Sequence, residues 1–148
     1  MQAKKILLYA FVILSSIQIA HAQKRNALLV GISTYGDNTG WKNIHGANDV
    51  DLMKSVLNGF SIRELKNANA TYDNIIKELN YLSKKTKEGD IVYIHFSGHG
   101  QPFEDINGDE QDGWDESFVP FDAHLYYEQN VYSGNKHLTD DILNTYLI

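Results

Sequence analysis

The stretch Gly89–Asp122, GDIVYIHFSGHGQPFEDINGDEQDGWDESFVPFD, decides the fold that we expect for the chain. Residues 91–96 form a near-continuous apolar run, which is typical of a strand covered on both faces in a parallel sheet. We therefore expect this strand to lie in the centre of the sheet. Gly98 and Gly100 flank His99, so the backbone can turn sharply and leave the imidazole uncrowded at the carboxyl end of the strand. Ligands of open α/β sheets bind at that end.

His99 is the candidate catalytic residue of this stretch. An imidazole near its unperturbed pKa takes and returns a proton at neutral pH, so a histidine held at a strand end suits general acid–base catalysis. A loop histidine without any chemical role is the alternative.

Segments before this strand predict a doubly wound α/β fold. The apolar run 27–32 indicates another buried strand, and residues 62–65 indicate a third, shorter one. Apolar residues at helical spacing predict one helix that begins near Gly46 and a second that opens at Thr71 and stops at Gly89. Strands that alternate with helices are typical of a mainly parallel sheet.

The segments after the acidic stretch give weaker signals. Residues 123–136 are polar and rich in tyrosine, and either a hairpin or a mobile loop fits them. A last helix is expected over residues 142–147, with Thr139 or Asp140 as its cap.

Length and composition limit the class of protein. The 148 residues suit one domain, and a hydrophobic content of 43% is enough for a core. The net charge of −6 argues against nucleic acid as a partner, and the acidic residues cluster between Glu104 and Glu116. The chain has no cysteine, which excludes disulfides and thiolate metal sites within it.

The first 22 residues have the layout of a secretory signal peptide. Two lysines precede an apolar run over residues 6–20, and Ala20-His21-Ala22 forms a small-x-small end. We expect cleavage after Ala22, one domain over residues 23–148, and a secreted or periplasmic protein that does not contact the membrane afterwards. A signal anchor and a buried first helix are the alternatives.

Three motifs resemble a known family. Residues 97–100 read SGHG, residues 105–116 read D-x-x-G-D-E-x-D-G-x-D-E, and residues 120–122 read P-x-D. Together they resemble the metacaspase branch of the caspase-like cysteine peptidases, and the similarity extends back to residues 27–33 and forward to residues 139–141. The resemblance implies a caspase-like αβα sandwich with a mainly parallel central sheet, of which this chain is the N-terminal part and is therefore incomplete.

The resemblance also implies a function. It implies a cysteine endopeptidase in which His99 is the general base, and in which the backbone N–H of Gly100 binds the oxyanion. The motif positions of the acidic pocket for Arg or Lys before the cleaved bond are Asp49 and Ser97. The nucleophilic cysteine is expected beyond Ile148, which falls inside an amphipathic helix.

Other functions remain open at this point. A caspase-like domain without a nucleophile could act as a binding or regulatory module, and the acidic stretch could serve a metal-dependent hydrolase. Asp49 could simply favour the positive end of a helix dipole.

The resemblance implies a regulatory Ca²⁺ site at Asp115, Asp140 and Asp141, whose oxygen ligands suit a hard cation. For the last two, helix capping is the alternative. The acidic stretch also matches five ligand positions of an EF-hand, but Glu110 stands where that loop needs glycine, and no helix is expected before it. We therefore disfavour an EF-hand and expect another geometry.

Overall fold

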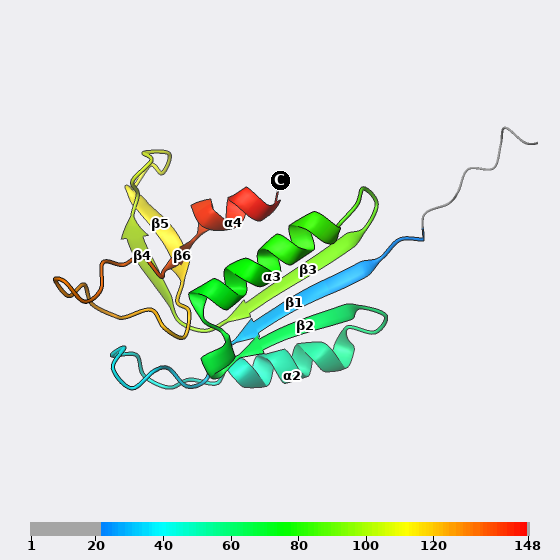
Figure 1. Cartoon of the computed structure of the whole chain (residues 1–148), viewed down its shortest axis with the longest axis horizontal. Coiled ribbons are helices and arrows are strands. Elements are labelled where there is room, and N and C mark those ends of the chain that lie inside the picture. The colour runs from blue at the N-terminus through cyan, green and yellow to red at the C-terminus, as the bar shows by residue number, and fades with distance from the viewer. Residues whose placement is uncertain (1–21, 148) are drawn as a thin grey trace, which may run out of the picture.

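The computed structural model describes residues 22–147, so the predicted signal peptide lies outside the described residues except for Ala22. The elements form two small sheets and three main helices (Figure 1). In chain order they are β1 Arg25–Gly31, α2 Gly46–Val56, β2 Ser61–Lys66, the 3₁₀ turn η1 Asn67–Asn69, α3 Tyr72–Lys85, β3 Ile91–Ser97, β4 Gly100–Glu104, β5 Trp114–Phe118, β6 Leu138–Thr139 and α4 Asp140–Leu147. Among these described helices, none is both long and apolar enough to cross a membrane.

The first sheet is parallel, as expected, with the strand order β2-β1-β3. Its three strands run in the same direction, so their carboxyl ends meet on the side of the second sheet (Figure 1). This arrangement places Gly31 of β1 beside Ser97 of β3 in the register of the sheet.

The expected central position of β3 is wrong for the described residues. β1 lies in the centre, where residues 27–31 are buried, whereas β3 pairs with β1 alone, and its Val92 is 36% exposed. The physical reason is that an apolar run reports whether both faces of a strand are covered. It carries no information on whether both edges are hydrogen-bonded.

Helices cover both faces of this sheet, which gives the αβα layers of the expected sandwich. Leu28 and Val30 of β1 belong to the core cluster that includes the buried side of α3. Ala27 and Leu29 point the other way and pack with Val50 of α2. α4 packs on the same core as α3, so these two helices share one face.

The helix boundaries differ slightly from the expected ones. α3 begins directly after Thr71, whose side chain accepts a hydrogen bond from the backbone N–H of Asn74 at 3.3 Å. It ends at Lys85, and Gly89 takes a positive φ of 87° in the turn that leads into β3. α4 begins at Asp140, before the expected residues 142–147.

The second sheet was not expected from the sequence. β4 and β5 form an antiparallel hairpin across the acidic loop, and the short strand β6 extends it. Residues 123–136 have one isolated antiparallel bridge, between Glu128 and Tyr132. Nδ1 of the buried His137 is hydrogen-bonded to the Tyr132 hydroxyl at 2.8 Å, and its Nε2 is hydrogen-bonded to Gln101 Oε1 at 2.9 Å. These bonds tie that segment to β4.

Candidate active site

The candidate site forms where the carboxyl ends of β1 and β3 meet the N-terminus of α2. A Cβ atom on Gly46 would lie 2.2 Å from the carbonyl oxygen of Ser97 and 2.8 Å from that of Ile32. Only glycine therefore allows the helix to approach both strand ends this closely. As a result, the first turn of α2 brings Asp49 to the end of β3.

Asp49 and Ser97, which the resemblance assigns to one pocket, are in contact. The Ser97 hydroxyl donates a hydrogen bond to Asp49 Oδ2 at 2.5 Å, and the Asp49 side chain is exposed. The ion pairs that join described residues involve other carboxylates. The Ser97 hydroxyl therefore orients the carboxylate of Asp49, which faces solvent, where an approaching cation can pair with it.

His99 is held by the loop that follows β1. Its backbone N–H donates to the hydroxyl oxygen of Tyr35 at 2.8 Å, and that hydroxyl lies 3.4 Å from the carbonyl oxygen of Val119. Its ring stacks on the indole of Trp41, with the ring centroids 4.9 Å apart and an interplanar angle of 27°. A side chain at the preceding Gly98 would place a Cβ 2.7 Å from the ring of Phe118, so a larger residue there would disturb the histidine.

The hydrogen bond of the imidazole defines which nitrogen is basic. Nε2 of His99 lies 2.8 Å from the carbonyl oxygen of Lys42. A carbonyl oxygen can only accept, so Nε2 carries the proton in this contact. The neutral ring then has its lone pair on Nδ1, and Nδ1 is the atom that can take a proton from a nucleophile.

The residues that orient His99 could not be found from the sequence. Tyr35, Trp41 and Lys42 lie in a loop without periodicity. Lys42 contributes only its backbone carbonyl, which a residue of any type could supply. The two aromatic rings in a glycine-containing loop are the single hint. Burial raises the pKa of Tyr35, so its hydroxyl remains protonated at neutral pH. Gly100, the predicted oxyanion donor, begins β4 directly after His99 and is exposed.

The acidic loop between β4 and β5 brings three carboxylates together. One oxygen from each of Asp105, Asp109 and Asp115 lies within 4.8 Å of the others. Asp115 is only 5% exposed, and its buried Oδ1 has no hydrogen-bond partner among the described residues. A buried carboxylate oxygen without a donor is costly, and a bound cation would remove that cost.

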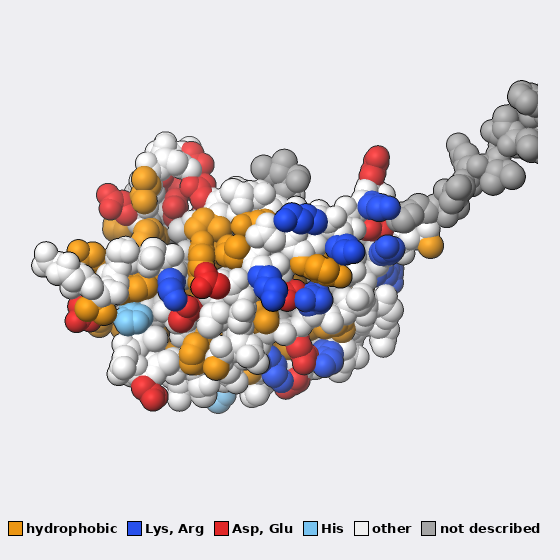
Figure 2. All heavy atoms as spheres, viewed as in Figure 1, with side chains coloured by type: hydrophobic (Ala, Val, Ile, Leu, Met, Phe, Trp, Pro, Cys, Tyr) orange, Lys and Arg blue, Asp and Glu red, His pale blue; other side chains and the backbone are white. Residues whose placement is uncertain are grey.

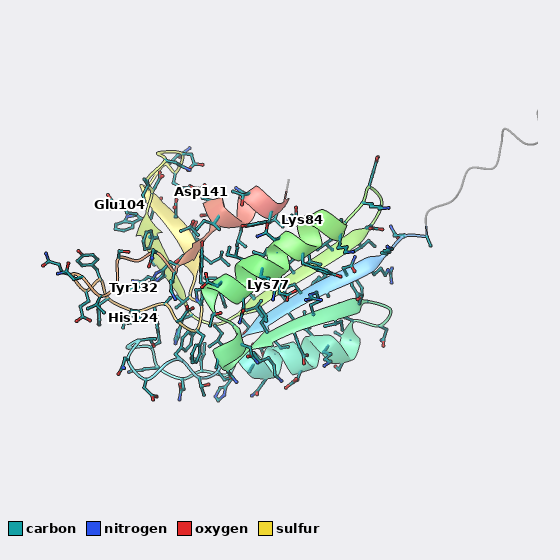
Figure 3. The ribbon with its side chains drawn as sticks, viewed as in Figure 1. Lys77, Lys84, Glu104, His124, Tyr132 and Asp141 are labelled. Carbon is teal, nitrogen blue, oxygen red and sulfur yellow. The ribbon has the colours of Figure 1, made fainter. Side chains whose placement is uncertain are left out.

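The other two predicted metal ligands lie at the start of α4 beside this trio. Asp141 accepts a hydrogen bond from the side chain of Asn107 at 2.5 Å, and Figure 3 shows it at the first turn of the helix. Asp140 accepts a bond from the backbone N–H of Asp141 at 3.1 Å. Burial raises the pKa of Asp115 and of Asp141, and mutual repulsion among the aspartates adds to both shifts. Asp105 and Asp109, which match ligand positions of the disfavoured EF-hand, thus lie close to the set that the resemblance implies.

No EF-hand is formed by this loop. Strands β4 and β5 flank it where an EF-hand needs helices, and the alternation along β5 turns Glu116 to the face opposite Asp115. The side chain of Asp105 instead accepts the backbone N–H groups of Gly108 and Glu110, which lowers its pKa.

A parallel sheet between helices, with a glycine-flanked histidine at the carboxyl end of a strand, is the arrangement that the resemblance to caspase-like peptidases implies. The family profile described as "Metacaspase, peptidase C14 domain" matches residues 25–147. The chain therefore belongs to the metacaspase family, which confirms the resemblance and places it among the caspase-like cysteine peptidases at the level of the family.

Individual relatives agree with this assignment. The chain is 34% identical over 139 residues to Metacaspase-1 of Debaryomyces hansenii, covering 84% of this chain and 29% of that protein. It is 29% identical over 138 residues to Metacaspase-1 of Pyricularia oryzae, covering 84% of this chain and 32% of that protein. A crystal structure of a Geobacter sulfurreducens protein is similar with a TM-score of 0.66 and 28% identity, covering 84% of this chain and 44% of the other. The chain thus spans about a third of the length of these curated relatives.

Proposed function

We propose that this chain is the histidine-bearing part of a cysteine endopeptidase that cleaves polypeptides after Arg or Lys, with the cysteine supplied by residues that follow Ile148. The observation that carries the proposal is which ring nitrogen of His99 carries the proton. Its Nε2–H is bonded to the Lys42 carbonyl, so Nδ1 is available as the base. A cysteine thiol needs such a base to become the thiolate nucleophile.

The proposed reaction follows from this geometry. Nδ1 of His99 takes the thiol proton, the thiolate sulfur attacks the carbonyl carbon, and the backbone N–H of Gly100 binds the oxyanion. The C–N bond then breaks as Nδ1 returns the proton to the leaving amine, which leaves a thioester that water hydrolyses. The stack of the His99 ring on Trp41 keeps the imidazole in one plane throughout.

Specificity for Arg or Lys rests on Asp49. A guanidinium or ammonium group loses water when it enters a pocket and needs a carboxylate partner. The Ser97 hydroxyl fixes one oxygen of Asp49 and leaves the carboxylate charge at the end of β3, two residues before His99. A substrate side chain paired there would hold its own carbonyl carbon close to the imidazole.

The open edge of β3 supports a nucleophile from a following segment. Among the described residues this edge has no strand partner, and a hollow of about 440 Å³ lies beside it. The hollow is lined in part by the apolar side chains of Leu82, Ile94 and Tyr146. One more parallel strand would fit this edge, and its carboxyl end would come out next to that of β3, which is the position that a cysteine needs to meet His99.

The test uses the full-length protein and reporter peptides. His99→Ala should abolish cleavage of every reporter, whereas Asp49→Ala should lower kcat/KM by about 10- to 100-fold for Arg and Lys reporters, the worth of a charged hydrogen bond. Asp51→Ala is the matched control, because it removes an exposed carboxylate from the same helix. An equal loss on Arg, Lys and uncharged reporters after Asp49→Ala would show that Asp49 supports the fold and not the pocket.

The acidic loop is proposed to hold a regulatory Ca²⁺. The supporting observation is that Asp115, whose buried Oδ1 has no hydrogen-bond partner among the described residues, places a carboxylate oxygen within 4.8 Å of oxygens of Asp105 and Asp109, with Asp141 beside them. An all-oxygen set of this charge fits Ca²⁺, which would neutralise the loop when bound. We expect Ca²⁺ to raise the melting temperature of the chain and Asp115→Asn to abolish that shift. Asp37→Asn, a remote exposed control, should keep it, and unchanged melting in chelator and in excess Ca²⁺ would contradict the site.

A nucleophile-free binding module is the second candidate, because the chain itself contains no cysteine. It would be favoured if the full-length protein bound Arg peptides but cleaved none. A metal-dependent hydrolase that uses the acidic stretch is less well supported, because the chain belongs to a family of cysteine peptidases.

A further inference from the structure

We propose that the outer face of the β4–β5 hairpin is a second binding site for a basic side chain of the peptide substrate, outside the Asp49 pocket. The site deepens the proposed function and rests on it, since it takes the substrate to be a polypeptide. It is defined by Trp114, Glu116, Asp112 and Pro102, which line a shallow groove of about 320 Å³.

Alternation along β5 separates the strand residues of this face from Asp115, the buried carboxylate of the proposed calcium site. Trp114 and Glu116 are exposed, whereas Asp115 between them is buried on the other side. In the register of the hairpin, Pro102 pairs with Glu116 and Glu104 pairs with Trp114. One indole, one proline ring and carboxylates therefore share one exposed face, and Figure 3 shows Glu104 at the outer side of β4.

The composition of this groove matches a cation with an apolar stem. Trp114 is 53% exposed, although an indole is usually well covered in a protein. An indole face attracts Lys and Arg, and nearby carboxylates add charge complementarity. The ion pairs that join described residues use neither Asp112 nor Glu116, and Figure 2 shows acidic side chains gathered over the hairpin while Lys and Arg lie mainly over the rest of this view.

Its position relative to His99 indicates that the occupant is part of the same peptide. β4 begins one residue after His99, and Pro102 is three residues from it along the chain. At about 3.3 Å per residue the groove extends from about 10 Å from His99, at Pro102, to about 17 Å, at Glu104 opposite Trp114, which an extended peptide spans with about three to five residues. The expected ligand is therefore a Lys or Arg about three to five residues from the cleaved bond.

The test measures binding by the chain itself, so it needs no cysteine. The protein has two tryptophans, and their indole N–H signals in nitrogen-15 NMR report the two sites separately, since Trp41 stacks on His99 and Trp114 lines the groove. The probe is a capped pentapeptide of Ala and Gly with one central Arg, titrated in chelator. We expect the Trp114 signal to shift with this peptide and not with the citrulline analogue, which keeps the shape and loses the charge.

Variants and a control separate this site from the Asp49 pocket. Glu116→Gln should weaken the affinity reported by the Trp114 signal about two- to fivefold, and Asp49→Ala should leave that affinity unchanged. Glu88→Gln removes one exposed charge elsewhere and should have no effect. Equal shifts of Trp114 with the Arg and citrulline peptides, or no shift at millimolar peptide, would overturn the proposal. Neither result would touch the peptidase proposal, whose failure appears as absent cleavage by the full-length protein.

Discussion

Gly46→Ala tests the close approach of α2 to the strand ends that brings Asp49 to Ser97. The new Cβ would lie 2.2 Å from the Ser97 carbonyl oxygen, about 1 Å short of the 3.4 Å at which ordinary van der Waals contact begins. Its other close neighbour, the Ile32 oxygen at 2.8 Å, is also backbone, so neither contact can be relieved by rotating a side chain. The helix must move, at a cost of about 1–3 kcal/mol for an overpacked site.

This cost can be measured by thermal and urea unfolding of the chain followed by circular dichroism. For a chain of this size the melting temperature should fall by about 2–12 °C. A displacement of about 1 Å would also stretch the 2.5 Å bond between Ser97 and Asp49, so the full-length variant should lose activity on Arg and Lys reporters.

Gly36→Ala is the matched control, because its nearest atom is a Thr39 methyl group at 3.2 Å, so a side chain and not the backbone must give, and only by about a few tenths of an ångström. An unchanged unfolding midpoint for Gly46→Ala would refute the reasoning about the site's construction.

Three further predictions concern pH and processing. Because the pKa of Asp115 is raised in the fold, the native state binds more protons than the unfolded chain, so stability in chelator should fall as pH rises from about 4 through the raised pKa. Asp115→Asn should flatten this part of the stability curve, and an unchanged curve would contradict the burial of this carboxylate. Burial lowers the pKa of His137, so the free energy of unfolding should decrease as pH falls below about 6.5. Urea unfolding measured at a series of pH values should show this decrease in the wild type and not in His137→Gln. The exported protein should begin at Gln23, whose side chain already bonds to the Gly89 carbonyl at 2.7 Å. N-terminal sequencing of exported protein that returned Met1 would rule this out.

The layers of the fold could be predicted from the sequence, because apolar runs and helical periodicity report burial directly. Residues 27–31 of the first apolar run and residues 91–96 of the second lie in strands, and Thr71 caps the second helix as its residue type suggests. The strand order could not be predicted, since pairing at an edge involves backbone groups that every residue carries. This is why β3 was expected in the centre and lies beside β1 at the edge of the described sheet.

The second sheet could not be predicted because strand β5 buries polar residues and exposes an apolar one, the reverse of the usual alternation. β5 turns Asp115 and Ser117 inward and Trp114 outward, so its polarity indicates the wrong face. The motif residues of the site were named from the resemblance, but the partners that orient His99 were not. Trp41 and the carbonyl of Lys42 reach it only through the course of a loop, which no periodicity predicts.

The most direct test of the central claim is to map the residue of the full-length protein that an Arg-containing, thiol-reactive peptide labels. We expect one labelled cysteine about 10 to 25 residues beyond Ile148, after one further buried strand, and loss of labelling in His99→Ala. The 148-residue chain should show neither labelling nor cleavage of Arg reporters. Cleavage by that chain, abolished by His99→Ala, would contradict the cysteine mechanism, because the nucleophile would then have to be a hydroxyl or a water within these residues.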